Sequence, residues 1–204
     1  MFWLDKWRQE LKIDCPKALI KNSPIFQSKA YLFQESKLES NDLPGLSKSG
    51  SRLALGCDNQ TSDLHALTMF DHFYGSGGRI FDTAFIYNHG LGDKYLGDWI
   101  NARRVEEDVI ILGKGAHTPE CEPKYIRPQL LKSLERLRIS KLDIFCLHRD
   151  NPDIPADEFI DALAEIKSEG LVNLIGASNW EMDRFSEARN YAIKHAKEPF
   201  TVLS

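Results

Sequence analysis

The chain has 204 residues, of which 42% are hydrophobic, and a formal net charge of -4 at pH 7. This size allows one domain with a buried core, or one domain with an extension. Basic and acidic residues are mixed and form no basic stripe, which argues against a nucleic-acid partner. No apolar run is long enough to span a bilayer, and the N-terminus carries no basic segment followed by an apolar one. We therefore expect a cytoplasmic protein without a membrane partner.

The four cysteines, Cys15, Cys57, Cys121 and Cys146, are widely spaced and form no Cys-x-x-Cys pair. This spacing argues against a disulfide framework and against a structural zinc site. Reduced thiols in the cytoplasm are the simplest expectation.

Residues 1–50 show no regular alternation of strands and helices and are predicted to be an N-terminal extension of unclear role. Apolar residues within 4–11 share one face of a short predicted helix. The turn-rich segment 41–50, together with 31–34, predicts a flap or hairpin that closes the bottom of a barrel. Residues 51–204 are predicted to form that barrel.

From residue 52 onward, short apolar runs alternate with segments of helical periodicity, as expected for a parallel sheet covered by helices. The predicted strands are 52–57, 79–84, 108–114, 141–148, 171–177 and 200–203. The predicted helices run from the N-cap Ser62 to about 74, near 91–103, over 126–137 behind Pro123, from Pro155 as first residue to Gly170, and over about 181–196.

Reactive side chains recur at the ends of these predicted strands. Asp82 lies where one strand stops and Tyr87 follows in its loop, while later strands end in Lys114, in His148 and in Ser178–Asn179, spaced roughly 30 to 34 positions apart. In a parallel (β/α) barrel the C-terminal strand ends share one face, where active sites are built. Each residue alone could have a purely structural role, as a cap, a packing tyrosine or a surface lysine. Their common phase predicts one site.

Several motifs follow one another in a fixed order from Arg52 to the end of the chain. They are Phe81-Asp82-Thr83-Ala84-x-x-Tyr87-x-x-Gly90 with Leu96-Gly97, Lys114 at a strand end, Ser133-Leu134-x-x-Leu137 before Asp143-x-x-x-Leu147-His148, and Glu169-Gly170 before Ile175-Gly176-Ala177-Ser178-Asn179. Together they resemble the aldo-keto reductases. The usual Glu after the Tyr loop reads Asp93 here, and a common Lys-x-Arg of the fifth strand reads Leu171-Val172-Asn173; we expect neither departure to touch the catalytic set.

The resemblance implies an α/β fold, a (β/α)8 TIM barrel truncated to about six strands and five helices. A closed barrel has eight strands and about 250 residues. The first and last strands would therefore be open apolar edges, unless the chain is a fragment or something else closes the sheet.

The resemblance also implies hydride transfer between NADP, with NAD not excluded, and a small-molecule carbonyl or sugar-derived substrate. Tyr87 would protonate the carbonyl oxygen. A phenol is a weak acid at neutral pH, and a nearby ammonium favours its ionised form, which is the role implied for Lys114. Asp82 would hold Lys114 charged and in place, and His148 would hydrogen-bond the carbonyl.

Ser178 and Asn179 resemble the pair that grips the nicotinamide carboxamide in this family, and a helix cap before Glu181 is their structural alternative. The remaining cofactor contacts of the family come from two βα units that would follow Ser204. We therefore expect the chain alone to bind NADPH poorly and to be nearly inactive, and the full-length product to be a reductase.

Three further hypotheses about domain organisation and function stay open. The phrases 114–119 and 148–152 resemble a bacterial subgroup in which this domain follows a sugar-oxidoreductase domain, which implies a fused or associated oxidoreductase domain. A non-catalytic regulatory or interaction barrel derived from a reductase is one alternative. The other is a metal-dependent hydrolase, with zinc held by Asp82 and by three histidines near strand ends, namely His89, His117 and His148.

Overall fold

The structure is a computed structural model that describes residues 37–204. Residues Leu38–Ser204 form one compact unit. No helix in this part of the chain is both long enough and apolar enough to cross a membrane. The helix predicted within 4–11 and the segment 31–34 lie outside the described residues.

The described residues form two sheets and five α-helices. The small sheet pairs β1 with β2 in antiparallel orientation, and the main sheet has six parallel strands in the order β3-β4-β5-β6-β7-β8. The strands are β1 (Ser40–Asp42), β2 (Ser49–Ser51), β3 (Ala54–Gly56), β4 (Ile80–Asp82), β5 (Ile110–Gly115), β6 (Leu142–Leu147), β7 (Val172–Ala177) and β8 (Val202–Leu203). The helices are α5 (Asp63–Gly75), α6 (Leu91–Arg103), α7 (Pro123–Leu137), α8 (Ala156–Ser168) and α9 (Met182–Lys194), with a short 3-10 helix η1 (Tyr87–Gly90). The predicted six strands and five helices are confirmed.

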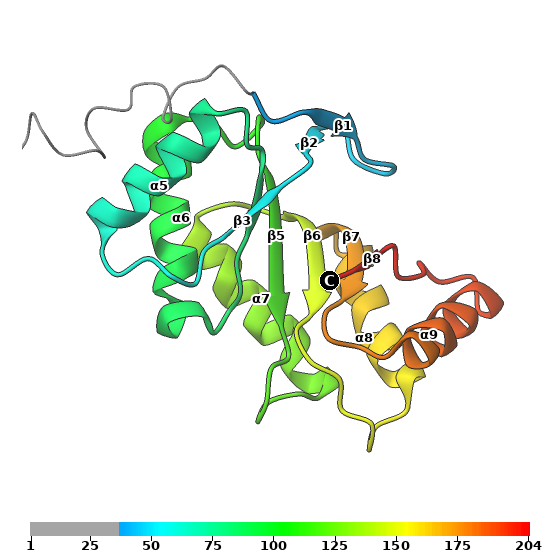
Figure 1. Ribbon diagram of the computed structural model, residues 1–204. Coiled ribbons are helices and arrows are strands. Elements are labelled where there is room, and N and C mark those ends of the chain that lie inside the picture. Colours follow the sequence, from blue (N-terminus) through cyan, green and yellow to red (C-terminus); the bar gives the residue numbers. More distant parts are fainter. Residues whose placement is uncertain (1–36) are drawn as a thin grey trace, which may run out of the picture. The chain divides into compact units, whose positions relative to one another are not determined.

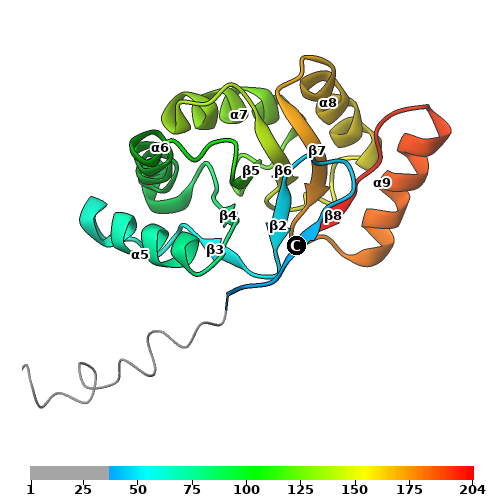
Figure 2. The ribbon, with the colours of Figure 1, turned by 90° about the horizontal axis from the view of Figure 1, so that it is seen from above.

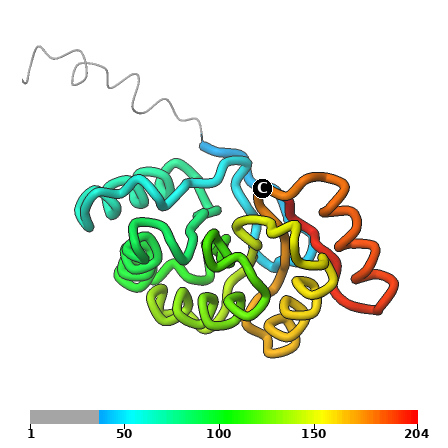
Figure 3. Tube along the Cα trace, turned by 90° about the horizontal axis from the view of Figure 1, so that it is seen from below, coloured from blue at the N-terminus to red at the C-terminus, as the bar shows by residue number. Residues whose placement is uncertain are grey.

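The main sheet is curled, and its helices cover only the outside. Figure 2, seen from above, and Figure 3, seen from below, show α5 to α9 as an arc around the strands. In Figure 1 the arrows of β5 and β6 point away from the end at which β1 and β2 lie. The C-terminal strand ends therefore meet at one rim, which we call the C-terminal rim, and the predicted hairpin within 41–50 lies at the opposite end.

Alternate side chains of β4 to β7 enter two separate cores, as the period of a β-strand requires. The larger core fills the space between the sheet and the helices and includes Phe70, Phe81, Trp99, Phe145 and Phe159. The smaller core lies inside the curl and consists of Ile110, Leu112, Ile144, Cys146 and Leu174. Leu43 and Leu46 of the hairpin pack against this inner core and thus close it at the end opposite the C-terminal rim.

Two local predictions need correction. Helix α5 begins as predicted, because the Ser62 side chain accepts the backbone N–H of His65 at 3.2 Å. Helical spacing with Leu67 and Tyr74 predicts Leu64 on the apolar face of this helix, but Leu64 is 72% exposed. Ala66 is buried instead, because two residues correspond to about 200° around a helix. Pro155 is the N-cap of α8 and not its first helical residue.

A partly buried ion pair joins the hairpin to the barrel. Lys48 Nζ donates to the carbonyl oxygen of Val109 at 2.9 Å and to Asp143 Oδ2 at 3.0 Å. The same Asp143 oxygen accepts the backbone N–H of Ile111 at 3.0 Å, and its side chain is only 6% exposed. Removal of the Lys48 ammonium would leave the buried Asp143 carboxylate with the backbone N–H of Ile111 as its hydrogen-bond donor.

We expect Lys48→Met to lower the free energy of unfolding by about 1–2 kcal/mol, because a buried charged hydrogen bond is lost. Urea denaturation measures this change. Arg52→Gln is the matched control, since Arg52 pairs with Glu39 where both side chains are more than half exposed. That change should stay within about 0.5 kcal/mol. Equal losses in the two variants would contradict the role of Lys48.

Candidate active site

Strand periodicity places the predicted polar residues at the C-terminal rim. On β5 the inward side chains are Ile110 and Leu112, so the next inward position belongs to Lys114. The strands lie in parallel register, with Asp82 opposite Leu112 and Lys114 opposite Cys146. The same step of two residues leads from Ile80 to Asp82, from Cys146 to His148 and, through Gly176, from Leu174 to Ser178.

Lys114 lies between an acid and a phenol. Its side chain is 3% exposed, and its ammonium forms an ion pair with Asp82. Lys114 Nζ also donates to Tyr87 Oη at 3.2 Å. Burial acts to lower the pKa of Lys114, but the Asp82 carboxylate and the Tyr87 hydroxyl outweigh burial, so the net shift is upward. Lys114 is therefore a cation at neutral pH.

His148 completes the group on the side of β6. Its ring packs edge-on against Tyr87 with centroids 5.5 Å apart, and against His117 with centroids 4.8 Å apart. Burial, with the positive charges of Lys114 and Arg149 and the nearby His117, lowers the pKa of His148 to about 3. The imidazole is therefore neutral at physiological pH and can donate one hydrogen bond.

Ser178 and Asn179 follow β7 at the same rim. Asn179 Nδ2 donates to the His148 carbonyl oxygen at 3.2 Å and to Ser178 Oγ at 2.9 Å. Helix α9 has Glu181 as its N-cap, without a side-chain cap, so the helix-cap alternative does not hold. Within the described residues, neither the Ser178 hydroxyl hydrogen nor Asn179 Oδ1 has a partner. A hydroxyl donor beside an amide acceptor matches the acceptor and donors of a carboxamide.

A sharp reversal of the chain positions Tyr87. Asn88, His89 and Gly90 all have positive φ, at 49°, 55° and 90°, a conformation that Asn and Gly adopt most readily. A Cβ atom at Gly92 would lie 2.7 Å from the Cys57 carbonyl oxygen and 3.0 Å from Tyr87 Cβ. Glycine at 92 thus allows the start of α6 to approach Tyr87 closely.

A buried carboxylate supports the loop between Asp82 and Tyr87, a role that no motif in the sequence predicted. Asp93 is fully buried and accepts hydroxyl groups from Thr83 at 2.6 Å and from Ser133 at 2.7 Å. Arg136 Nη1 lies 3.8 Å from this carboxylate and donates to the carbonyl oxygen of Phe85 at 2.8 Å. Asp93, which stands where the family usually has Glu, therefore contacts Thr83, the residue next to Asp82. No signal in the sequence pointed to Arg136, 51 residues from Phe85.

Asp93 is expected to make stability depend on pH. Burial raises its pKa from 3.8 to about 6, although the hydroxyl groups and Arg136 act to lower it. Between these values the folded state binds the extra proton, so this contribution to stability falls as pH rises from about 4 to about 6. Asp93→Asn removes the effect, and its advantage over wild type should grow by roughly 2–3 kcal/mol between pH 4 and pH 7.

Denaturation at a series of pH values measures this difference. Asp98→Asn is the matched control on the same helix, because that side chain is 37% exposed and pairs with Lys94 and Arg138 at the surface. Parallel pH profiles of wild type and Asp93→Asn would show that Asp93 does not titrate as described.

The three histidines of the metal alternative do not form one cluster, because His117 and His148 pack against each other whereas His89 lies elsewhere. His89 lies with Leu91 and Arg136 at a surface hollow of about 470 Å³ on the outside of α6 and α7. Residues 37–204 contain no group of three or more His, Cys, Asp or Glu side chains that could hold a metal ion. The cysteines in this part of the chain are buried free thiols, namely Cys57, Cys121 and Cys146.

The sequence profile of the aldo/keto reductase family matches residues 48–203. The chain belongs to this family. An aryl-alcohol dehydrogenase [NADP(+)] from Phanerodontia chrysosporium is 29% identical over 150 residues, which cover 66% of this chain and 39% of that protein. The uncharacterized oxidoreductase YqkF of Bacillus subtilis is 31% identical over 139 residues, covering 63% and 45%. The chain thus spans about two fifths of the length of these relatives.

Solved aldo-keto reductases share the fold. The holo form of an aldo-keto reductase from Bacillus halodurans superposes with a TM-score of 0.68 at 26% identity, covering 81% of this chain and 56% of that one. A thermostable aldo-keto reductase, Tm1743, superposes with a TM-score of 0.69 at 25% identity, covering 81% and 61%. The curled sheet of this aldo-keto reductase chain therefore corresponds to part of such a barrel.

Proposed function

We propose that the natural protein containing this chain is an NAD(P)H-dependent carbonyl reductase, or alcohol dehydrogenase in the reverse direction, in which Tyr87 is the general acid. The observation that carries the proposal is the position of the Lys114 ammonium, which contacts both the Asp82 carboxylate and Tyr87 Oη. Reduction of a carbonyl places negative charge on its oxygen, so a reductase needs a proton donor at that atom.

Each side chain has a separate task in this proposal. Tyr87 uses its Oη as acceptor from Lys114, so the hydroxyl hydrogen is available for the substrate oxygen. After proton transfer the ammonium stabilises the phenolate. Asp82 keeps Lys114 charged, and the neutral His148 donates a hydrogen bond that orients the carbonyl.

A nicotinamide cofactor supplies the hydride in this chemistry. The free hydroxyl hydrogen of Ser178 and the free Oδ1 of Asn179 fit its carboxamide, and we assign these two residues to hold it. NADP is favoured over NAD because the relative from P. chrysosporium carries NADP(+) in its name. A small-molecule carbonyl compound, sugar-derived or not, is the proposed substrate.

The experiment is a spectrophotometric assay of the natural protein at full length with NADPH or NADH and a panel of aldehydes and ketones. Oxidation of the cofactor with formation of the alcohol is expected. If neither cofactor is oxidised with any carbonyl compound, the proposal is wrong. The division at residue 50, the fused or associated oxidoreductase domain and the cytoplasmic location stay predictions.

A further inference from the structure

Arg149 lies at the C-terminal rim beside the proposed catalytic group. Its Nε donates to Nε2 of His117 at 3.4 Å. The His117 ring packs against His148, and the His148 ring packs against Tyr87. Only one imidazole ring therefore separates the guanidinium from His148, which is proposed to orient the carbonyl.

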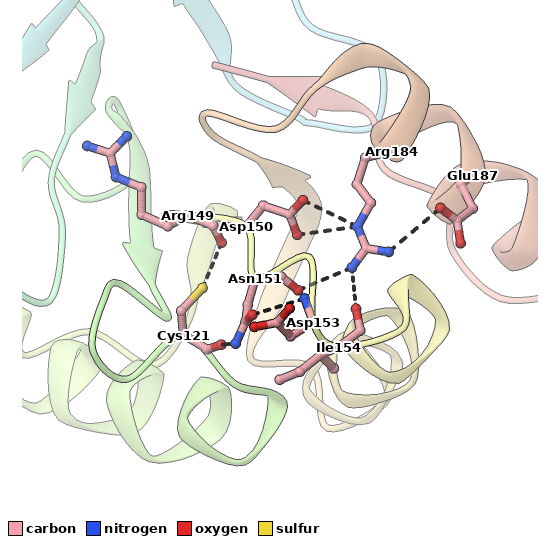
Figure 4. A network of polar contacts seen from close by, with 8 residues as sticks. All are labelled: Cys121, Arg149, Asp150, Asn151, Asp153, Ile154, Arg184 and Glu187. Atoms are coloured by element: carbon pink, nitrogen blue, oxygen red, sulfur yellow. Dashed lines mark hydrogen bonds and ion pairs between the residues drawn. The ribbon is translucent and has the colours of Figure 1, made fainter.

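Two carboxylates of this region are engaged elsewhere, namely Asp150, which follows Arg149 in the chain, and Glu120, which lies three residues after His117. Asp150 accepts a hydrogen bond from Arg184 Nε at 3.3 Å, and Glu120 accepts one from Gln129 Nε2 at 2.7 Å. Figure 4 shows the guanidinium of Arg149 extended away from Asp150 and Arg184. Among residues 37–204 no ion pair of Arg149 is found, so its two Nη groups have no acidic partner in the described part of the chain.

The backbone at this position is held without help from the Arg149 side chain. Cys121 Sγ donates to the Arg149 carbonyl oxygen at 3.1 Å, and Asn151 Nδ2 donates to the Cys121 carbonyl oxygen at 3.1 Å. Arg184 donates to the carbonyl oxygens of Asn151 and Ile154, which ties the loop to α9. A structural role therefore does not account for the extended guanidinium.

The charges at the rim leave a positive centre at Arg149. The charge of Lys114 is balanced by Asp82. His148 is neutral, and His117 is in contact with Arg149 Nε through its Nε2 atom, while its Nδ1 atom lies 2.9 Å from the Thr118 carbonyl oxygen. Arg149 is thus a cation near His148 that has no acidic partner among the described residues.

We propose that Arg149 binds a carboxylate of the carbonyl substrate, so that the preferred substrates are aldehydes or ketones that also carry an acid group. A planar guanidinium donates two parallel hydrogen bonds to a carboxylate. One guanidinium matches one monoanionic carboxylate, whereas a phosphate dianion would need further donors. This inference rests on the proposed function and adds the class of its substrate.

The test compares 4-carboxybenzaldehyde with its methyl ester, which has a similar shape but no charge. With the full-length natural protein, kcat/KM for the acid should exceed that for the ester by about tenfold, mainly through KM, as expected for one charged hydrogen-bonded contact. Arg149→Gln should remove this preference, so that the variant reduces acid and ester with equal kcat/KM. Arg149→Lys should keep part of the preference for the acid that Arg149→Gln loses, since lysine has the charge but lacks the planar guanidinium.

Arg52→Gln is the matched control, because it removes the same charge at the opposite end of the barrel and should keep the preference. Thermal denaturation checks that Arg149→Gln is folded. Equal reduction of acid and ester by wild type, or an equal loss of both in Arg149→Gln, overturns the carboxylate site and leaves the proposed function standing.

Calorimetry provides a readout that does not depend on turnover. In the presence of NADP⁺ no reduction takes place, and 4-carboxybenzaldehyde should bind wild type more tightly than Arg149→Gln by about tenfold. Identical binding to the two proteins overturns the inference. If no carbonyl compound is reduced with either cofactor, the proposed function fails, and the calorimetric comparison still decides whether Arg149 binds a carboxylate.

Discussion

Tyr87→Phe is expected to lower kcat for carbonyl reduction by roughly 10²–10⁴, the usual contribution of a positioned general acid. The change removes one oxygen atom, which is the atom that Lys114 Nζ contacts at 3.2 Å. The ring contact with His148 does not involve this oxygen and should remain. KM and cofactor affinity should therefore change little. Steady-state kinetics and fluorescence titration with NADPH measure the two effects separately.

Tyr74→Phe is the matched control for this variant. Tyr74 also loses a single hydroxyl group, but that group donates to Asp108 at 3.0 Å at an exposed site. Its kcat should equal that of wild type. Unchanged kcat in Tyr87→Phe would remove Tyr87 from its assigned role and would favour the non-catalytic barrel.

Lys114→Met is expected to lower kcat by at least as much as Tyr87→Phe does, and also to destabilise the protein. The variant leaves the Asp82 carboxylate without its ammonium partner. Breaking a buried ion pair costs about 3–5 kcal/mol, and the loss here should be nearer to 2 kcal/mol because the Asp82 side chain is 25% exposed. Kinetics and urea denaturation of the same preparation measure the two losses.

The double variant Asp82→Asn/Lys114→Met separates stability from catalysis. Without the unpaired carboxylate most of the lost stability should return, whereas kcat should stay low because no ammonium stabilises the phenolate of Tyr87. Lys48→Met is the control at the hairpin end, where a Lys–Asp pair is broken without a loss of kcat. Recovery of kcat together with stability would show that Lys114 acts only through folding.

Strand and helix positions could be predicted well because each depends on residues close together in the chain. Helix α6 has the predicted bounds 91–103, and the apolar run 108–114 forms β5 with a shift of one or two residues. Strands β3 and β4 are shorter than the predicted 52–57 and 79–84, since only three residues of each pair in the sheet. Local pattern fixes the existence of a strand, but its partners fix its length.

The contacts of the site depended on parts of the chain far apart in sequence. The left-handed backbone after Tyr87, the support of Phe85 by Arg136 and the contact of Arg149 with His117 have no periodic signal. Asp93 hydrogen-bonds Thr83, the neighbour of Asp82, and not a member of the predicted catalytic set. Such side chains meet only when neighbouring βα units are packed against each other.

The sequence by itself determined which residues end the parallel strands, because a period of two within each strand puts Asp82, Lys114, His148 and Ser178 on the inner face. The tertiary structure alone decided that an amine would lie within hydrogen-bond reach of a phenol contributed by a different βα unit. Periodicity is set by neighbouring residues. The distance between two strand ends is set by the register and curl of the whole sheet.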